Sequence, residues 1–390
     1  MIDKHIADLL DEMIDLRRDF HKHPELGYEE KRTGKIIAEY LRGLGMEVHE
    51  GIGVTGVVGL LRGESPGRTV MLRADMDALP IQEESDAEYR SIHDGVMHAC
   101  GHDGHMAILM GTAGVLNRMK DSFSGCVKFV FQPAEESLGG AKKMIEDGVL
   151  ENPHVDAAFG LHLISMLPTG YIGWKYGPIM AGMDSFTITI KGKGGHCAMP
   201  EGGVDAILIS AQVISALQSL ATREISPLSP AVIHVGTIHG GNAPNVIADR
   251  VVLEGTVRTL DKHVQELIGQ RMERLLAGIT QAMGGSFELE YTSGYPVTVN
   301  DADMTDMVKA AGQQVVGLDH LLEMPPAMAS EDMSLYLQRV PGSYFYVGAR
   351  NTEKGFVHPH HNSLFDFDEH ALTTGAAMMC RLAISFLDGR

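Results

Sequence analysis

The octapeptide HACGHDGH, residues 98–105, combines histidine, cysteine and aspartate side chains with small residues. Cys100 and His102 are two residues apart just before a predicted helix, so both can project toward one point from a strand-to-helix loop. A thiolate and an imidazole are both good ligands for zinc-type ions. Taken alone, the octapeptide is also compatible with a buried cysteine beside surface histidines, and donors elsewhere in the chain add weight to the metal interpretation.

Two adjacent acids, Glu135 and Glu136, follow an apolar strand and Pro133. Neighbouring acids usually form a solvated helix face, but loops at strand ends present side chains for binding and catalysis. In metal-assisted hydrolysis one carboxylate can bind the ion while its neighbour accepts a proton from the activated water. The position of this pair therefore favours chemistry over a solvated surface.

Two further histidines extend the set of donors. His162 ends the apolar strand FGLHL, and His361 lies in the histidine cluster HPHHNSLFDFDE near the C-terminus. Each alone has a simpler interpretation, as a core histidine and as an exposed loop residue. Together the donors predict a site for two divalent ions, with Glu135 free to act as a base. The expected ligands are Cys100, His102, Glu136, His162 and His361.

Charge and cysteine usage exclude other functional classes. The 390 residues carry 32 Lys and Arg against 51 Asp and Glu, a formal net charge of -19, with no basic run, so neither nucleic acid nor a membrane is an expected partner. The cysteines are far apart and residues 1–20 predict an amphipathic helix rather than a signal peptide, which favours a cytoplasmic location. The apolar stretch 206–222 is too short and polar for a membrane span.

Two glycine-rich patterns are not interpreted as catalytic. GIGVTG (51–56) fits the dinucleotide-binding pattern, and GESPG (63–67) fits the pattern around a nucleophilic serine. Each motif requires a helix after the glycines, whereas a strand-like run follows here.

Alternating strands and helices predict an α/β layer with function at the strand ends. Helices are expected over 1–20, 29–44 and from the octapeptide to 119. Strands are expected at 54–61, 68–75, 126–133 and 156–163.

The pattern changes at about residue 182. From there to 294 the order strand–helix–strand–strand–helix–strand predicts a separate ferredoxin-like α+β domain. Helix and strand patterns resume after Ala302, so the sequence predicts a discontinuous first domain, 1–181 and 295–390, with residues 182–294 inserted.

The chain resembles the M20 metallopeptidase family, in particular its amidohydrolase branch of N-acyl-amino-acid, hippurate and auxin-conjugate hydrolases. The matching stretches occur in family order and cover nearly the whole chain. They are RRDFHKHPELGYEE, LRADMDALPIQEE, MHACGHDGHMAILMG, FVFQPAEES, FGLHL, GGHCAMP, GGNAPNVIAD, EGTVRTLD, ASEDMSLYL and HHNSLFDFDE.

The resemblance implies a two-metal catalytic domain with a mixed sheet flanked by helices, and an inserted lid that forms a homodimer. It assigns the two ions to the five ligands above and the role of general base to Glu135. Asp75 would fix a ligand imidazole, as metal-bound histidines commonly require, and Asp103 would either act similarly or cap a helix. In the lid, His196 would stabilise the oxyanion, and Asn245 and Arg258 would bind polar groups of the substrate, although an arginine in such a strand is often only a surface ion-pair residue.

One departure concerns the metal itself. Peptidase branches of the family carry His-x-Asp where this chain has Arg73-Ala74-Asp75, and Cys100 is what the amidohydrolase branch offers instead. A bridging thiolate is softer and more oxidisable than a carboxylate. Zinc, manganese, cobalt and nickel all remain candidates for the two divalent metal ions.

The expected activity is hydrolysis of N-acyl amino acids to a carboxylic acid and a free amino acid. A dipeptidase or aminopeptidase of the same fold is the nearest alternative. A thiol hydrolase built on Cys100 and a non-catalytic protein with a structural zinc are the others, although structural zinc sites are closed and rich in cysteine. The sequence does not specify the acyl group, the amino acid, its stereochemistry or the pathway.

Overall fold

The computed structural model describes residues 1–136 and 139–389, which form two compact units. The first unit comprises Met1–Gly177, Val299–Pro325 and Leu335–Arg390, and the second comprises Pro178–Thr298 and Pro326–Ser334. The predicted insertion, 182–294, lies within the second unit, but Pro326–Ser334 belongs to that unit as well and lies outside the predicted bounds. Backbone hydrogen bonds explain the difference, because the amide of Ala181 donates to the carbonyls of Ala327 and Ala329 at 3.0 and 2.8 Å.

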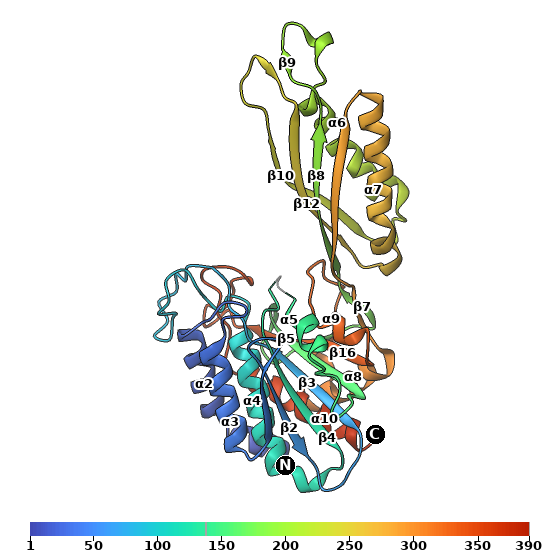
Figure 1. Ribbon diagram of the computed structural model, residues 1–390. Coiled ribbons are helices and arrows are strands. Elements are labelled where there is room, and N and C mark those ends of the chain that lie inside the picture. Colours follow the sequence, from blue (N-terminus) through green and yellow to red (C-terminus); the bar gives the residue numbers. More distant parts are fainter. Residues whose placement is uncertain (137–138, 390) are drawn as a thin grey trace. The chain divides into compact units, whose positions relative to one another are not determined.

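The first unit is built on an eight-stranded mixed sheet in the described part of the chain, in the order β1-β2-β4-β3-β5-β16-β6-β15 (Figure 1). Its strands are β1 (Glu47–Ile52), β2 (Gly56–Arg62), β3 (Thr69–Asp75), β4 (Cys126–Gln132), β5 (Ala157–Pro168), β6 (Ile172–Trp174), β15 (Leu321–Glu323) and β16 (Gly342–Arg350). β4, β3, β5 and β16 run parallel to one another. Every residue of β3 and β4 is buried, as is typical of parallel strands covered on both faces.

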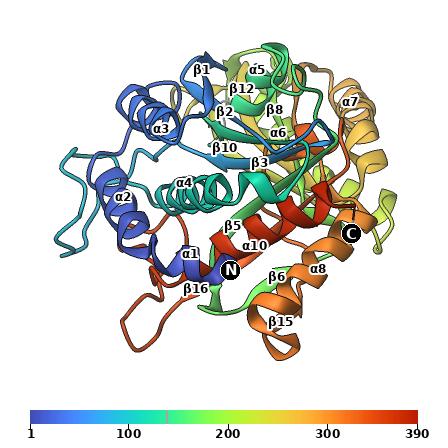
Figure 2. The same ribbon diagram turned by 90° about the horizontal axis from the view of Figure 1, so that it is seen from below.

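The helices of the first unit pack on this sheet and on one another. They are α1 (Ile2–Ala7), α2 (Leu10–Lys22), α3 (Lys31–Gly43), α4 (His102–Arg118), α5 (Gly140–Glu146), α8 (Ala302–Val316), α9 (Ser334–Leu337) and α10 (Ala371–Leu387), with α9 starting at the last residue of the second unit. Figure 2 shows α4 and α10 side by side. Gly375 permits this approach, because a β-carbon there would lie 2.6 Å from the Ile108 side chain.

The N-terminal helix differs from the single helix that the sequence predicts. The chain forms α1 and α2 with a break at Leu9, whose φ of −111° and ψ of 0° interrupt the helical backbone. Leu9 and Ile6 are both buried in the core at this break. The spacing of apolar residues is the same on both sides of the break, so helical periodicity alone does not predict that the helix is interrupted at Leu9.

The second unit has the predicted ferredoxin-like order, which confirms this part of the fold. Its elements are β8 (Gly182–Lys191), α6 (Ala206–Ser219), β10 (Ala231–Gly240), β12 (Arg250–Thr259), α7 (Lys262–Ala282) and β13 (Ser286–Tyr295). The strands form an antiparallel sheet in the order β10-β12-β8-β13, and β9 (Gly195–His196) pairs with β11 (Val246–Ile247). The chain passes between the units in β7 (Gly177–Met180) and β14 (Thr298–Asn300).

Aspartates begin both helices of the second unit. The carboxylate of Asp205 accepts hydrogen bonds from the first amides of α6, and Asp261 does the same for α7. The stretch Ala206–Glu224 has the length and apolar composition of a membrane span, but buried core helices have the same properties. Ile209, Val213 and Leu217 of this stretch are buried in the core of the unit, as in an ordinary core helix.

Candidate metal centre

The carboxyl ends of β3 and β4 bring the first donors together. Asp75 pairs with Gln132 at the last position of the two parallel strands. The residues that follow, Asp77 from β3 and Glu135 and Glu136 from β4, therefore leave the sheet at the same edge. In an open parallel sheet this edge is where ligands bind.

The start of α4 contributes the next two donors. Gly101 has a φ of 89°, in the left-handed region that glycine adopts without penalty, and it lies between Cys100 and His102. Both flanking side chains are buried. The Sγ atom of Cys100 lies 3.4 Å from Nε2 of His162, which comes from β5.

The five predicted ligands converge in the first unit. Within each of three groups, the potential ligand atoms lie within 4.8 Å of one another. Cys100 belongs to two of these groups, as expected of a thiolate that bridges two ions. The groups are Cys100, His102 and His162; Cys100, Glu136 and His361; and His102, Glu135 and Glu136.

The imidazole of His102 is oriented for a ligand at its second nitrogen. Its Nδ1 lies 2.8 Å from the carbonyl oxygen of Asp77, to which it can donate a hydrogen bond. Its Nε2 is buried and has no hydrogen-bond partner in the described part of the chain. A buried nitrogen whose ring is fixed in this way is what a metal ligand requires, so the donor set fits a cation.

The electrostatics around His102 and His361 also favour positive charge. Burial lowers the pKa of His102, but Asp75 and Cys100 outweigh burial and hold that pKa well above its usual value. Contacts with Cys100 and then Glu136 raise the pKa of His361 to about 10. Protons on these imidazoles occupy positions where a divalent ion can replace them, because metal binding releases protons from its ligands.

Two residues at the cluster have unusual backbone conformations. His361 has a φ of 64°, and its amide donates to the carbonyl of Ala99 at 2.8 Å. Ala134, directly before Glu135, has a φ of 53°. The left-handed conformation costs a non-glycine residue about 1–2 kcal/mol, and strain of this kind concentrates at functional sites.

Asp75 lies closest to a histidine outside the predicted set of ligands. Its Oδ1 lies 2.6 Å from Nδ1 of His105, whereas Nε2 of His102 is 3.8 Å away. His105 in turn accepts a hydrogen bond from the amide of Leu163 at 2.9 Å, so its ring is fully used within the protein. Asp75 therefore orients His105 directly, and its role in fixing a ligand imidazole stays a prediction.

Asp77 is the residue that sequence reasoning missed. Besides its carbonyl contact with His102, its Oδ2 accepts a hydrogen bond from the amide of Glu136 at 2.9 Å. It thus orients two predicted ligands at once. Its position as the second aspartate of ADMD, beyond a buried strand, was the available signal.

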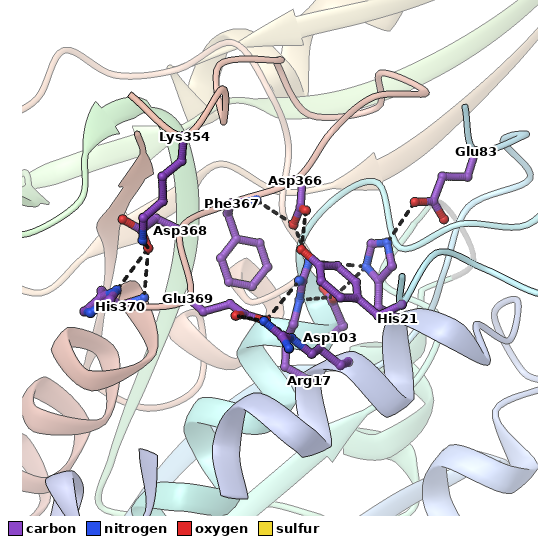
Figure 3. A network of polar contacts seen from close by, with 12 residues as sticks. Arg17, His21, Glu83, Asp103, Lys354, Asp366, Phe367, Asp368, Glu369 and His370 are labelled. Atoms are coloured by element: carbon purple, nitrogen blue, oxygen red, sulfur yellow. Dashed lines mark hydrogen bonds and ion pairs between the residues drawn. The ribbon is translucent and has the colours of Figure 1, made fainter. Parts of the chain in front are cut away.

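Asp103 has a different role from either one expected. Its Oδ2 lies 2.8 Å from Nε of Arg17 and 2.8 Å from Nδ1 of His21, and it makes no helix-capping contact (Figure 3). The fully buried Arg17 also pairs with Asp366 at 2.6 Å. We call Arg17, His21, Asp103, Asp366 and Glu369 the arginine network.

The arginine network holds two ligand-bearing segments in place. Asp103 directly follows His102, and Asp366 lies in the segment that contains His361. Breaking a buried ion pair by removing one partner is strongly destabilising, because it leaves an uncompensated charge. Arg17 therefore connects the start of α4 to the C-terminal loop through side chains outside the predicted set of ligands.

Three predicted site residues lie in the second unit. His196 is exposed on β9, where it pairs with Val246 of β11, next to Asn245. Arg258 of β12 donates to the carbonyl of Met328 at 3.2 Å and the hydroxyl of Ser330 at 3.3 Å. It forms no ion pair among the described residues, so the surface ion-pair interpretation does not hold there.

A mixed α/β sheet with clustered donors at its carboxyl edge is an architecture that metal-dependent hydrolases use. The model of the peptidase family M20/M25/M40 matches residues 71–385. Thermostable carboxypeptidase 2 of Saccharolobus solfataricus is 44% identical over 98% of this chain and 97% of its own length. N-acetylcysteine deacetylase of Bacillus subtilis is 39% identical over 96% of this chain and 97% of its own length.

A solved structure agrees with these relatives. A Bacillus subtilis protein described as a dinuclear metal binding peptidase from the M20 family has a TM-score of 0.87 and 35% identity, over 98% of this chain and 99% of that chain. The chain belongs to the M20 peptidase family. It is a hydrolase that acts on amide bonds, as the resemblance implied.

Proposed function

We propose that the protein hydrolyses N-acyl amino acids to a carboxylic acid and a free amino acid, using two divalent ions. The observation that carries this proposal is the convergence of the five donors around Cys100, beside the carboxylate of Glu135. Cys100, His102 and His162 would hold one ion, and Cys100, Glu136 and His361 the other. When bound, the ions supply Lewis acidity that lowers the pKa of water and polarises the amide carbonyl.

In this proposal the chain's own residues move the protons. Glu135 takes a proton from the attacking water and delivers it to the leaving nitrogen. Asp77 and the strand ends hold the ligands still, so that little reorganisation accompanies the reaction. His196 opposes the charge that develops on the carbonyl oxygen, Asn245 binds polar groups and Arg258 binds an α-carboxylate. These three roles rest on the family resemblance alone.

A substrate panel tests the proposal. We expect hydrolysis of N-acetyl and N-benzoyl amino acids, with kcat/KM at least tenfold above that for dipeptides with a free amino group. The relatives include a carboxypeptidase and a deacetylase of N-acetylcysteine, and neither name implies recognition of a free amino group. Release of the amino acid is measured with ninhydrin or by chromatography. A preference for unblocked dipeptides would replace the proposal with the dipeptidase or aminopeptidase alternative.

We further propose that the second unit forms a homodimer through β10 and α6. β10 is at the edge of its sheet, where unpaired backbone groups can accept another strand. Val232 and Ile238 on β10 and Ile207 and Leu208 on α6 are all exposed. The side-chain amide of Gln218 on α6 donates to the carbonyl of Ile233 on β10, so the two elements are adjacent.

Ile238→Lys is expected to convert the dimer to a monomer, because a charge on an edge strand blocks pairing with a second copy. Sedimentation equilibrium measures the mass of the particle. Thr292→Lys is the matched control, because Thr292 is exposed on β13, at the opposite edge of the same sheet. A dimer that persists in Ile238→Lys and dissociates in Thr292→Lys would place the interface at the other edge.

We propose that the two ions are drawn from four candidate metals and that the protein is cytoplasmic. Zinc, manganese, cobalt and nickel all match a site of thiolate, imidazole and carboxylate. The four cysteines are all free, which is compatible with the predicted cytoplasmic location.

A further inference from the structure

Glu30 is a buried carboxylate close to the proposed base. It precedes α3, but its side chain does not cap that helix. Instead its Oε1 accepts a hydrogen bond from the amide of Ala134 at 2.9 Å, and its Oε2 accepts one from the hydroxyl of Thr55. Burial raises the pKa of Glu30 to about 7, and nearby Asp77 adds to this increase. No cation pairs with it in the described part of the chain, so its burial is costly.

The backbone that Glu30 contacts belongs to Ala134, which has a strained, left-handed conformation. Ala134 has a φ of 53° and is completely buried. Its carbonyl accepts a hydrogen bond from the amide of Gly140 at 3.1 Å. Gly140 must be glycine, because a β-carbon there would lie 1.6 Å from the carbonyl oxygen of Pro133. Surrounding contacts therefore hold Ala134 in a conformation that alanine rarely adopts on its own.

Glu135 lies between two amides that buried carboxylates hold. Glu30 binds the amide of Ala134 on one side, and Asp77 binds the amide of Glu136 on the other. The chain direction at Glu135 is thus fixed from both sides. A change of φ at Ala134 would redirect the Glu135 side chain while leaving Glu136 attached to Asp77.

We propose that Glu30 is a positioning residue for Glu135. Glu30 holds Ala134 in the left-handed conformation, and this conformation orients the side chain of Glu135. This inference rests on the proposed function, in which Glu135 transfers the protons. It assigns Glu30 no contact with substrate or metal. Its effect is expected on kcat, with little change in metal binding.

The test compares substitutions at Glu30 in the metal-loaded enzyme. Glu30→Ala should lower kcat about 10- to 100-fold, because small displacements of a catalytic group have effects of that size. KM and metal content should stay within twofold. Glu30→Gln should keep most of the activity, because its amide oxygen can still accept the hydrogen bond from Ala134. If Glu30→Ala does not fold, Glu30→Asp should show the same loss, because its shorter side chain withdraws the oxygen from Ala134.

A second substitution provides a rescue. Glycine adopts positive φ without strain. Adding Ala134→Gly to Glu30→Ala should therefore raise kcat at least fivefold above that of Glu30→Ala alone. Glu25→Ala is the matched control, because Glu25 also accepts backbone hydrogen bonds, from the amides of Arg32 and Thr33 at the start of α3. It should lower thermal stability without lowering kcat.

The outcomes separate this inference from the proposed function. Normal kcat in Glu30→Ala, combined with an inactive Glu135→Gln, would reject the role of Glu30 alone. An active Glu135→Gln would reject the proposed function itself. Loss of metal in step with activity in Glu30→Ala would assign Glu30 to the stability of the metal centre and overturn the inference.

Discussion

Glu135→Gln is expected to lower kcat by about 10²- to 10⁴-fold, the usual contribution of a general acid–base residue. The substitution keeps the size of a side chain that is only 7% exposed and removes its ability to accept a proton. Because the ligands Cys100, His102, Glu136, His162 and His361 are unchanged, the metal content should be unaffected. Steady-state kinetics and elemental analysis of the same preparation measure the two quantities.

Glu136→Gln is the informative companion to this variant. Glu136 lies 3.1 Å from Nε2 of His361 and is a predicted ligand, so its amide variant should lose activity together with metal. Glu135→Gln would then keep its metal, whereas Glu136→Gln, at the next position, would lose it. Turnover near the normal rate in Glu135→Gln would remove that residue from the mechanism.

Removal of metal is expected to abolish activity, and addition of one of the four candidate ions should restore it. The same treatment should lower the melting temperature, because a ligand at 100 times its Kd stabilises a folded protein by about 2.7 kcal/mol. Calorimetry with and without chelator checks stability independently of turnover.

The chelation experiment also tests the thiol alternative. A hydrolase that uses Cys100 as the nucleophile would remain active in chelator and lose activity on alkylation. In the metal-dependent enzyme, bound ions should protect Cys100 from alkylation, because the thiolate is a ligand. Full activity in a metal-free preparation would contradict the proposal.

The fold could be predicted because its signals are local. Continuous apolar runs identified β3, β4 and β5, and the element order identified the ferredoxin-like second unit. The segment Pro326–Ser334 could not be assigned, since it joins the second unit through backbone hydrogen bonds to Ala181 and has no periodicity of its own. Boundaries that depend on distant pairing are not encoded in a local pattern.

In the candidate site, too, some features could be predicted from the sequence and others could not. The types of side chain indicated which residues could bind metal, and the structure brings the five together, although their role as ligands stays a prediction. The supporting contacts were less predictable, because Asp77 was not singled out and the nearest histidine to Asp75 is His105. The carboxylate of Asp75 contacts His105, whereas the backbone carbonyl of Asp77, two residues later, contacts His102. The sequence alone does not distinguish these two contacts.

The arginine network has a consequence for synthesis on the ribosome. Arg17 meets Asp366 across 349 residues of sequence. At about 5–20 residues per second, the nascent chain waits roughly 17–70 s between the two. Most of the second unit, Pro178–Thr298, is made well before then, while Cys100 and His102 still lack His361. Of the two proposed ions, the one that needs His361 would therefore bind later in synthesis than the one held by Cys100, His102 and His162.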